Sequence, residues 1–325
     1  MTTSSLNWPV AALRDAELRD RTYMRVGGRA RWLVEPATPD ELRLAILTAR
    51  ERGFVPRILG GGCNMIIEDG LHDCVVITTD RMKRCFRPMR GSASFEEESQ
   101  RSELVHMPPA EDPRLVVWAG TTLQKLCSTA TELGISGMEC LAGVPGQLGG
   151  GVAMNAGGRY GEMWDSVEVV RVIEPDGRML DLPRAECTPR YRNGGLGGER
   201  VVAGAILRLV PQTRAEVRER AKQYLLEKNK VQPVMEWSAG CVFKNPDKQR
   251  SGGLSAGQLV ERCGLKGRER GDAYVSPQHG NFVINRAHAS SDDILGLIEE
   301  VRAEVASQTG VELELEVKVW RREPR

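Results

Sequence analysis

Apolar residues spaced three and four apart, each run opening with a capping signature, predict the helices of this chain. Thr38 precedes Pro39 and Glu41, and the apolar positions that follow end near Gly53, which predicts a helix over this stretch. The same spacing of Ser or Thr before Glu, Gln or Asp predicts further helices that begin at residues 121–124, 213–216, 255–258 and 290–293.

Short runs rich in β-branched residues lie between these helices and predict strands. The runs span residues 55–59, 74–79, 115–118, 167–173, 201–210 and 273–284. A turn signal, Pro175-Asp176-Gly177, follows one run and precedes Met179-Leu180, which predicts a hairpin. At least part of the sheet is then antiparallel, and we expect an α+β fold rather than a purely doubly wound one.

A chain of 325 residues is longer than one hydrophobic core usually supports, so two or three domains are expected. Residues 86–112 are polar, rich in Ser and Glu, and aperiodic, which predicts a long mobile loop. A second boundary is expected near Pro211, before a long charged helix over 215–230. The expected division is therefore 1–85, the loop 86–112, then 113–210 and 211–325.

The composition indicates an ordinary globular protein, with a net charge of +1 and 41% apolar residues. Such a charge provides no large cationic field, so no nucleic-acid partner is expected. The N-terminus lacks an apolar targeting segment, and no later stretch reaches the roughly 20 apolar residues of a membrane span, so a cytoplasmic protein is expected. Cysteines without a C-x-x-C pair and histidines without ligand spacing predict no metal site.

The first candidate for chemistry is a glycine cluster, Gly60-Gly61-Gly62-Cys63-Asn64, directly after the predicted strand that ends at Leu59. Backbone without side chains can approach an anion closely and offer it consecutive N–H groups, as a pyrophosphate requires. The spacing is that of neither a Rossmann fingerprint nor a P-loop. A glycine-rich turn without a ligand is the alternative.

The second candidate is the longer glycine-rich stretch 141–158, in which glycines are mixed with Leu, Val, Ala and Met. Flexible linkers are polar and rich in Gly and Ser, so this stretch does not have the composition of a linker. Backbone packed closely against a flat, largely apolar ligand would have this composition. A bound flavin would fit it.

In the order and spacing of its motifs the chain resembles the UDP-N-acetylenolpyruvoylglucosamine reductase family, over nearly its whole length. The matching motifs are residues 26–30, 60–64, 141–156, Tyr191-Arg192, Gln232-Pro233, 239–246, 264–267, 275–276 with His279, 281–282 and 313–317. The chain ends soon after Glu316 without a tyrosine-bearing insertion, as in the shorter subtype of the family.

The resemblance implies a vanillyl-alcohol-oxidase-like FAD-binding fold, built from subdomains 1–85 and 113–210, with a UDP-sugar-binding domain at 211–325. It implies non-covalent FAD that NADPH reduces, and transfer of hydride to the enolpyruvyl group of UDP-N-acetylglucosamine enolpyruvate. The product would be UDP-N-acetylmuramate, a peptidoglycan precursor. The implied partners are these small molecules alone, and we expect a monomer that does not bind membranes.

Three catalytic residues are implied. Arg192 would bind the substrate carboxylate, since a guanidinium can hold it bidentately while negative charge develops. Cys241 stands where the family usually has serine as proton donor, and a thiol also carries a transferable proton. Glu316 would help to stabilise or protonate the intermediate. Without the resemblance, Arg192 would pass for a surface arginine, Cys241 for an inert thiol, and Glu316 for a solvated strand residue.

The resemblance also implies binding residues. Those expected to contact FAD are Leu59, Gly60, Gly61, Gly62, Cys63, Asn64, Gly120, Gly143, Val144, Pro145, Gly146, Gly149, Gly150, Ala153, Asn155, Ala156 and Gly157. Those expected to contact the substrate are Tyr191, Arg192, Lys228, Lys230 and Asn245. The two lysines flank Asn229, which stands where the family has a basic residue for the UDP.

Two other functions are compatible with these motifs. The first is a flavin-linked oxidase or dehydrogenase of the same fold, which often tethers FAD through a histidine, for which His72 is the nearest candidate. The second is a non-catalytic relative that keeps the FAD or UDP-sugar pocket. The joint presence of Arg192, a proton-bearing residue at 241 and Glu316 argues against the second.

Overall fold

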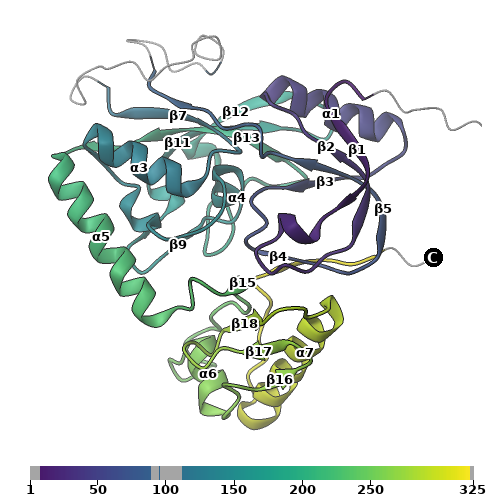
Figure 1. The fold of residues 1–325 in the computed structure, drawn as a ribbon. Coiled ribbons are helices and arrows are strands. Elements are labelled where there is room, and N and C mark those ends of the chain that lie inside the picture. Colours follow the sequence, from purple (N-terminus) through teal and green to yellow (C-terminus); the bar gives the residue numbers. More distant parts are fainter. Residues whose placement is uncertain (1–7, 89–94, 96–111, 323–325) are drawn as a thin grey trace, which may run out of the picture. The chain divides into compact units, whose positions relative to one another are not determined.

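The computed structural model describes residues 8–88, 95 and 112–322 (Figure 1). The chain divides into two compact units, and each is built from separate stretches of sequence. Unit 1 comprises Met1–Leu13, Trp32–Gly61 and Cys74–Leu226, and unit 2 comprises Arg14–Arg31, Gly62–Asp73 and Glu227–Arg325. The boundary falls within strands β1 (Ala12–Glu17), β2 (Arg29–Val34) and β5 (Leu71–Thr78) and within helix α5 (Arg214–Val231).

Unit 1 combines an antiparallel sheet with helices. Its helices are α1 (Pro39–Glu51), α3 (Leu123–Leu133), α4 (Leu148–Ala153) and most of α5. Its strands are β3 (Pro56–Leu59), β6 (Cys85–Phe86), β7 (Arg114–Trp118), β8 (Ile135–Ser136), β9 (Gly157–Gly158), β10 (Gly161–Glu162), β11 (Val167–Ile173), β12 (Met179–Pro183), β13 (Val201–Arg208) and β14 (Val210–Pro211). The main sheet has the order β12-β11-β13-β7-β6, and β3 pairs in parallel with β5 in the sheet β1-β2-β5-β3.

Unit 2 packs helices against a second antiparallel sheet of order β15-β18-β17-β16 (Figure 1). Its elements are β4 (Met65–Ile67), β15 (Trp237–Cys241), α6 (Ala256–Arg262), β16 (Glu269–Arg270), β17 (Ala273–Val275), β18 (Phe282–Asn285), α7 (Ser291–Thr309) and β19 (Lys318–Trp320). Residues from early and late in the chain share its core, where Met24, Val26 and Ile66 pack with Phe243 and Ile298.

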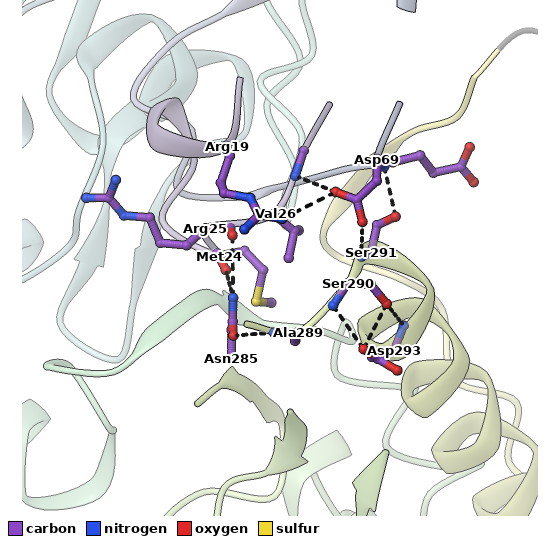
Figure 2. A network of polar contacts seen from close by, with 12 residues as sticks. Arg19, Met24, Arg25, Val26, Asp69, Asn285, Ala289, Ser290, Ser291 and Asp293 are labelled. Carbon is purple, nitrogen blue, oxygen red and sulfur yellow. Dashed lines mark hydrogen bonds and ion pairs between the residues drawn. The ribbon is translucent and has the colours of Figure 1, made fainter. Parts of the chain in front are cut away.

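Polar contacts also join these distant stretches within unit 2 (Figure 2). The Asp69 carboxylate accepts the N–H of Ser291 at 2.7 Å, and the Asp69 N–H donates to the Ser291 hydroxyl at 2.9 Å. The Asn285 amide donates to the carbonyl of Met24 at 2.9 Å. Asp69 thus supplies a carboxylate to the first turn of α7, where the helix dipole favours negative charge.

The capping signatures are confirmed as helix starts, with one shift. Thr38 accepts the N–H of Glu41 at the start of α1, and Ser290 and Asp293 form a complete capping box at the start of α7. At α3 the cap is Thr122 rather than Thr121, because the Thr121 hydroxyl donates to the carbonyl of Arg84 instead.

The predicted hairpin at 175–177 is confirmed, since β11 and β12 pair in antiparallel register around it. The run 273–284 proved to be two strands, β17 and β18, joined by a turn in which the Ser276 hydroxyl accepts the N–H groups of Gln278 and His279. The predicted loop 86–112 lies mostly outside the described residues. Of it, Phe86 and Phe95 are buried together with Val116 and Ile206.

Candidate functional site

The first glycine cluster begins in unit 1, at the carboxyl end of β3. Because β3 and β5 are parallel, their carboxyl ends meet at the same edge of the sheet. There the Thr79 N–H donates to the carbonyl of Leu59 at 3.2 Å. Gly60 therefore lies beside Thr79, and a Cβ at Gly60 would be 3.9 Å from its hydroxyl oxygen.

Gln147 joins this edge to the second glycine cluster. Its side-chain oxygen accepts the Thr79 hydroxyl at 2.6 Å, and its side-chain nitrogen donates to Asp80 at 2.6 Å. A Cβ at Gly60 would be 3.4 Å from the same oxygen. Gln147 is buried, so this pair of bonds fixes the start of α4 against the ends of β3 and β5.

The glycines around this edge permit close backbone contact and leave room for a ligand. A Cβ at Gly120 would be 1.8 Å from the carbonyl oxygen of Thr79, so only glycine fits there. By contrast, a Cβ at Gly150, in the first turn of α4, would meet nothing within 4 Å. Closely packed backbone beside open space is the arrangement that a flat dinucleotide requires, so these residues fit FAD.

The Tyr-Arg motif forms a tight turn that is fastened to the end of the second glycine cluster. Arg190 and Asn193 exchange backbone bonds of 2.8 and 3.0 Å, which leaves Tyr191 and Arg192 at the tip, with Arg192 in the left-handed region at φ 57°. An Arg192 guanidinium N–H donates to the carbonyl of Gly157 at 3.0 Å. Tyr191 is 46% exposed and lies beneath the Arg192 guanidinium, 5.0 Å from it.

The glycine cluster continues into unit 2, where Tyr23 contacts it. The Gly62 carbonyl accepts the Tyr23 N–H at 3.1 Å, and a Cβ at Gly62 would be 2.0 Å from the carbonyl oxygen of Arg21. The Tyr23 side chain is hydrogen-bonded to Cys63. Partial burial, and then Cys63, raise the pKa of Tyr23, so its hydroxyl keeps its proton.

Cys241 ends β15 at an irregularity in the sheet. Cys241 pairs with Phe282 and Ser238 with Ile284, and the register shifts between them, where Gly240 has φ 76°. Asn281 holds the residues that follow Cys241. Its carbonyl accepts the N–H of Val242 at 2.9 Å, and its side chain bonds the N–H and C=O of Phe243 at 2.9 and 2.8 Å.

Glu316 lies on the segment that pairs with these residues. The Val242 carbonyl accepts the N–H of Glu316 at 2.8 Å and that of Val317 at 3.4 Å, so two residues oppose one, as in a β-bulge. Val317 is buried and Glu316 is half-buried, whereas Glu312 and Glu314 are exposed. The bulge therefore takes Glu316 out of the solvent-facing alternation that its sequence pattern suggests.

Asn64, the last residue of the first glycine cluster, holds Glu316 from its other side. The Asn64 side-chain nitrogen donates to the carbonyl of Glu316 at 3.1 Å, and the Asn64 carbonyl accepts the N–H of Lys318 at 2.9 Å. Unit 2 thus brings together Cys241, Glu316 and one end of the predicted pyrophosphate cradle.

Two predicted substrate residues of unit 2 lie at a helix terminus, and the third contacts one. Lys228 and Lys230 are in the last turn of α5, where cations are favoured by the helix dipole. Asn245 is exposed, and its side-chain oxygen accepts the N–H of Ala256 at the start of α6 at 3.1 Å. Their contact with a UDP group stays a prediction.

His72 is placed as a structural residue. It is 2% exposed, and its Nε2 is 2.7 Å from the carbonyl oxygen of Glu68. Since a carbonyl only accepts, Nε2 carries the proton. This burial gives no support to His72 as a flavin tether.

Among the described residues, no group of His, Cys, Asp and Glu is placed to hold a metal ion. None of the helices described is both long and apolar enough to span a bilayer.

The candidate site residues are therefore divided between the units. Unit 1 holds Leu59 to Gly61, Gly120, the residues of the second glycine cluster, Tyr191 and Arg192, whereas Gly62 to Asn64, Lys228, Lys230, Cys241, Asn245 and Glu316 belong to unit 2. Convergence of all three catalytic residues stays a prediction.

Sequence reasoning missed Thr79, Gln147 and Tyr23. Gln147 is the polar residue within the second glycine cluster, and its position between Gly146 and Leu148 was the available signal. Thr79 ends a predicted strand, as ligand-binding residues of such sheets often do. The contact of Tyr23 with Cys63 had no local signal, because 40 positions separate the two residues in sequence.

Comparison with known proteins gives consistent matches across the chain. The family model described as UDP-N-acetylenolpyruvoylglucosamine reductase, C-terminal domain, matches residues 232–320, and that described as FAD binding domain matches residues 30–183. The UDP-N-acetylenolpyruvoylglucosamine reductase of Moorella thermoacetica is 36% identical over 309 residues, which cover 95% of this chain and 93% of the relative. That of Oleidesulfovibrio alaskensis is 38% identical, with 93% and 96% covered.

A solved structure matches as well. The crystal structure of the UDP-N-acetylenolpyruvylglucosamine reductase of Thermus caldophilus superimposes with a TM-score of 0.74 at 33% identity. The match covers 96% of this chain and 99% of that one.

Proposed function

Because this chain belongs to the UDP-N-acetylenolpyruvoylglucosamine reductase family, we propose that it reduces UDP-N-acetylenolpyruvoylglucosamine to UDP-N-acetylmuramate, with FAD as cofactor and NADPH as reductant. It is a flavin-dependent oxidoreductase of peptidoglycan precursor synthesis, with a vanillyl-alcohol-oxidase-like FAD-binding fold and a C-terminal substrate domain. The match to relatives over about 95% of the chain carries this conclusion.

When bound, FAD would supply hydride-transfer chemistry between NADPH and the enolpyruvyl group. The residues that would hold it in unit 1 are those around Gly60, Gly120 and Gly150, where packed backbone borders open space. In unit 2 they are Gly62, Cys63 and Asn64. We propose that the backbone N–H groups of this glycine-rich segment bind the pyrophosphate.

Arg192 would bind the substrate carboxylate. Hydride addition places negative charge on the carbon next to that carboxylate, and a guanidinium held against it stabilises the charge as it develops. The left-handed backbone of Arg192 and its bond to Gly157 support this role, since both fix the side chain before substrate arrives.

Cys241 would donate the proton. Its S–H bond breaks as the proton joins the carbon next to the carboxylate, and the resulting thiolate regains a proton from solvent. A thiol serves here as a serine hydroxyl would, with a lower reference pKa of about 8.5. The backbone bonds of Asn281 to the two residues after Cys241 support a fixed donor position.

Glu316 would act beside Cys241. Its backbone N–H is bonded to the residue that follows Cys241, so the two side chains emerge from adjoining chain segments. A carboxyl beside a developing anion helps most when it is protonated. We therefore propose that Glu316 carries a proton in the substrate complex.

Several finer assignments belong to the same proposal. We propose a cytoplasmic monomer with small-molecule partners, in which Lys228, Lys230, Tyr191 and Asn245 contact the UDP-sugar. We also propose the functional division into FAD subdomains 1–85 and 113–210 and a substrate domain 211–325.

The proposal is tested on the purified holoenzyme by its visible spectrum. NADPH should bleach the flavin bands, and UDP-N-acetylenolpyruvoylglucosamine, added without oxygen, should restore them with formation of UDP-N-acetylmuramate. UDP-N-acetylglucosamine, which lacks the enolpyruvyl group, should restore nothing and serves as control. Bleaching that the enolpyruvyl sugar does not reverse would contradict the assignment.

A further inference from the structure

From the last residue of α4 onward, the chain contacts the Tyr-Arg turn at alternate positions. The Ala153 carbonyl accepts the N–H of Gly194 at 2.8 Å, and the Gly157 carbonyl accepts a guanidinium N–H of Arg192 at 3.0 Å. Between them, Asn155 contacts Arg190. Residues on both sides of Arg192 are thus fastened to the stretch that closes the second glycine cluster.

Ala153 and Gly157 bond the turn through their backbone carbonyls, whereas Asn155 bonds through its side-chain amide. Its nitrogen donates to the Glu162 carboxylate at 2.6 Å and to the Arg190 carbonyl at 3.2 Å, and its oxygen accepts the Trp164 N–H at 3.2 Å. Both hydrogens of the amide nitrogen are therefore used within the protein. Asn155 is 2% exposed, so its side chain is not available to a cofactor.

The contact with Arg190 is at the base of the turn. The Arg190 carbonyl already accepts the N–H of Asn193 at 3.0 Å, so Asn155 occupies the second acceptor site of that oxygen. Glu162 belongs to the hairpin β9–β10 and caps the next helical turn. The Asn155 amide therefore connects that hairpin to the turn that carries Arg192.

The backbone of Asn155 suits the same residue type. Its φ of 46° lies in the left-handed region, which asparagine tolerates better than most residues do. An aspartate would fit the same space, but its oxygen would face two acceptors, the Glu162 carboxylate and the Arg190 carbonyl. Asparagine is therefore required for its hydrogens as well as for its backbone.

We propose that Asn155 is a positioning residue, which sets the Arg192 guanidinium for the substrate carboxylate through the base of the Tyr-Arg turn. This inference rests on the proposed function, because that function assigns the carboxylate to Arg192. It gives Asn155 a role toward the substrate, where the sequence motif alone suggested contact with FAD.

The test compares two ligands on the oxidised, FAD-loaded enzyme, which does not turn over. UDP-N-acetylenolpyruvoylglucosamine carries the carboxylate and UDP-N-acetylglucosamine lacks it, and both are titrated by the change in flavin absorbance. Asn155→Asp should weaken the first ligand roughly 10- to 100-fold and the second by less than about threefold, as expected for a displaced carboxylate clamp. Equal weakening of both ligands, or of neither, overturns the proposal.

A double variant, in which Asn155→Asp is combined with Arg192→Lys, separates this inference from the proposed function. If Asn155 acts through Arg192, Asn155→Asp should add nothing to the effect of Arg192→Lys on the carboxylate ligand, whereas independent roles would add. If Arg192→Lys leaves that affinity unchanged, neither the carboxylate-binding role of Arg192 nor the positioning role of Asn155 holds. If Arg192→Lys weakens the affinity but Asn155→Asp does not, only the positioning role of Asn155 is wrong.

The matched control is Asp181→Asn, which exchanges the same two groups elsewhere in unit 1. Asp181 bonds Arg171 at 2.6 and 2.7 Å, so its loss should also lower the melting temperature. It should change the affinity for neither ligand. If Asn155→Asp fails to retain FAD, Asn155→Ser removes the same bonds without the repulsion and is titrated in its place.

Discussion

The Tyr-Arg turn of unit 1 and the Cys241 strand of unit 2 hold their catalytic candidates by different means. Arg192 lies at the tip of a two-residue turn and depends on bonds to Gly157 and, through Arg190, to the Asn155 side chain. Cys241 lies in a sheet, beside Val242 and Phe243, which are fully or almost fully buried in the core of unit 2. The position of Arg192 therefore depends on a few polar groups, whereas the position of Cys241 depends on strand pairing and on the buried core of unit 2.

This difference predicts how each region tolerates change. A side chain in the strand can be exchanged while the backbone stays in place, because pairing and burial fix it. In the turn, the loss of one polar group shifts the residue that carries the chemistry.

The largest effect is expected at Cys241. Cys241→Ala should slow reoxidation of the reduced flavin by the enolpyruvyl sugar about 10²- to 10⁴-fold, since the proton donor is lost. Reduction by NADPH should be unchanged, because the strand keeps its position. Stopped-flow absorbance measures both steps, and Cys241→Ser, which restores a donor, is the control. An alanine variant as active as the parent would remove Cys241 from the mechanism.

The next largest effect is expected at Arg192. Arg192→Lys keeps the charge but loses the planar fork, so kcat/KM for the enolpyruvyl sugar should fall about 10²- to 10³-fold. The melting temperature should change little, since lysine keeps the charge and can still donate to the Gly157 carbonyl. Steady-state kinetics and a thermal scan of the same preparation measure the two quantities. A lysine variant with normal kcat/KM contradicts the role of the guanidinium.

A smaller effect, on stability, is expected at the base of the turn. A Cβ at Gly194 would be 2.3 Å from the carbonyl oxygen of Val152, whereas a Cβ at Gly158 would meet nothing within 4 Å. Gly194→Ala should therefore cost about 1–3 kcal/mol of stability. Gly158→Ala should stay within about 0.5 kcal/mol of the parent. Thermal denaturation compares them, and equal midpoints would show that the turn is not packed against this segment.

The smallest effect concerns two thiols of unit 1. Burial raises the pKa of Cys85 and of Cys140 to about 12, with nearby Glu139 and Asp165 adding to the rise at Cys140. Both thiols therefore stay protonated at pH 8, and iodoacetamide should leave them unlabelled at that pH. Labelling should begin only as the pH approaches the raised pKa of about 12. Peptide mass spectrometry detects the labelled positions. Rapid labelling of Cys85 at pH 8 would contradict its raised pKa.

Much of the fold could be predicted because local signals decided it. Thr38 and Ser290 are helix caps whose partners lie three residues away, and the hairpin at Gly177 depends on adjacent turn residues. The α3 cap was misplaced by one residue because Thr121 is bonded to Arg84, a partner 37 positions away. Long-range partners of this kind leave no trace in a local pattern.

The site divides in the same way. The glycine clusters are visible in sequence because only glycine permits close contacts such as those at Gly62 and Gly157. The altered setting of Glu316 was not visible, since alternation predicted a solvated carboxylate and the bulge opposite Val242 depends on a distant strand. The bonds of the Asn155 side chain likewise involve Arg190, which no pattern around residue 155 reveals.

The interleaved construction of unit 2 has a consequence for biosynthesis. A ribosome adds about 5–20 residues per second, and domains generally fold as they emerge from it. The core that Met24, Val26 and Ile66 share with Phe243 and Ile298 cannot form until the last two have been synthesised. The nascent chain therefore exposes apolar side chains through most of its translation. A C-terminal fragment expressed alone would lack part of its own core.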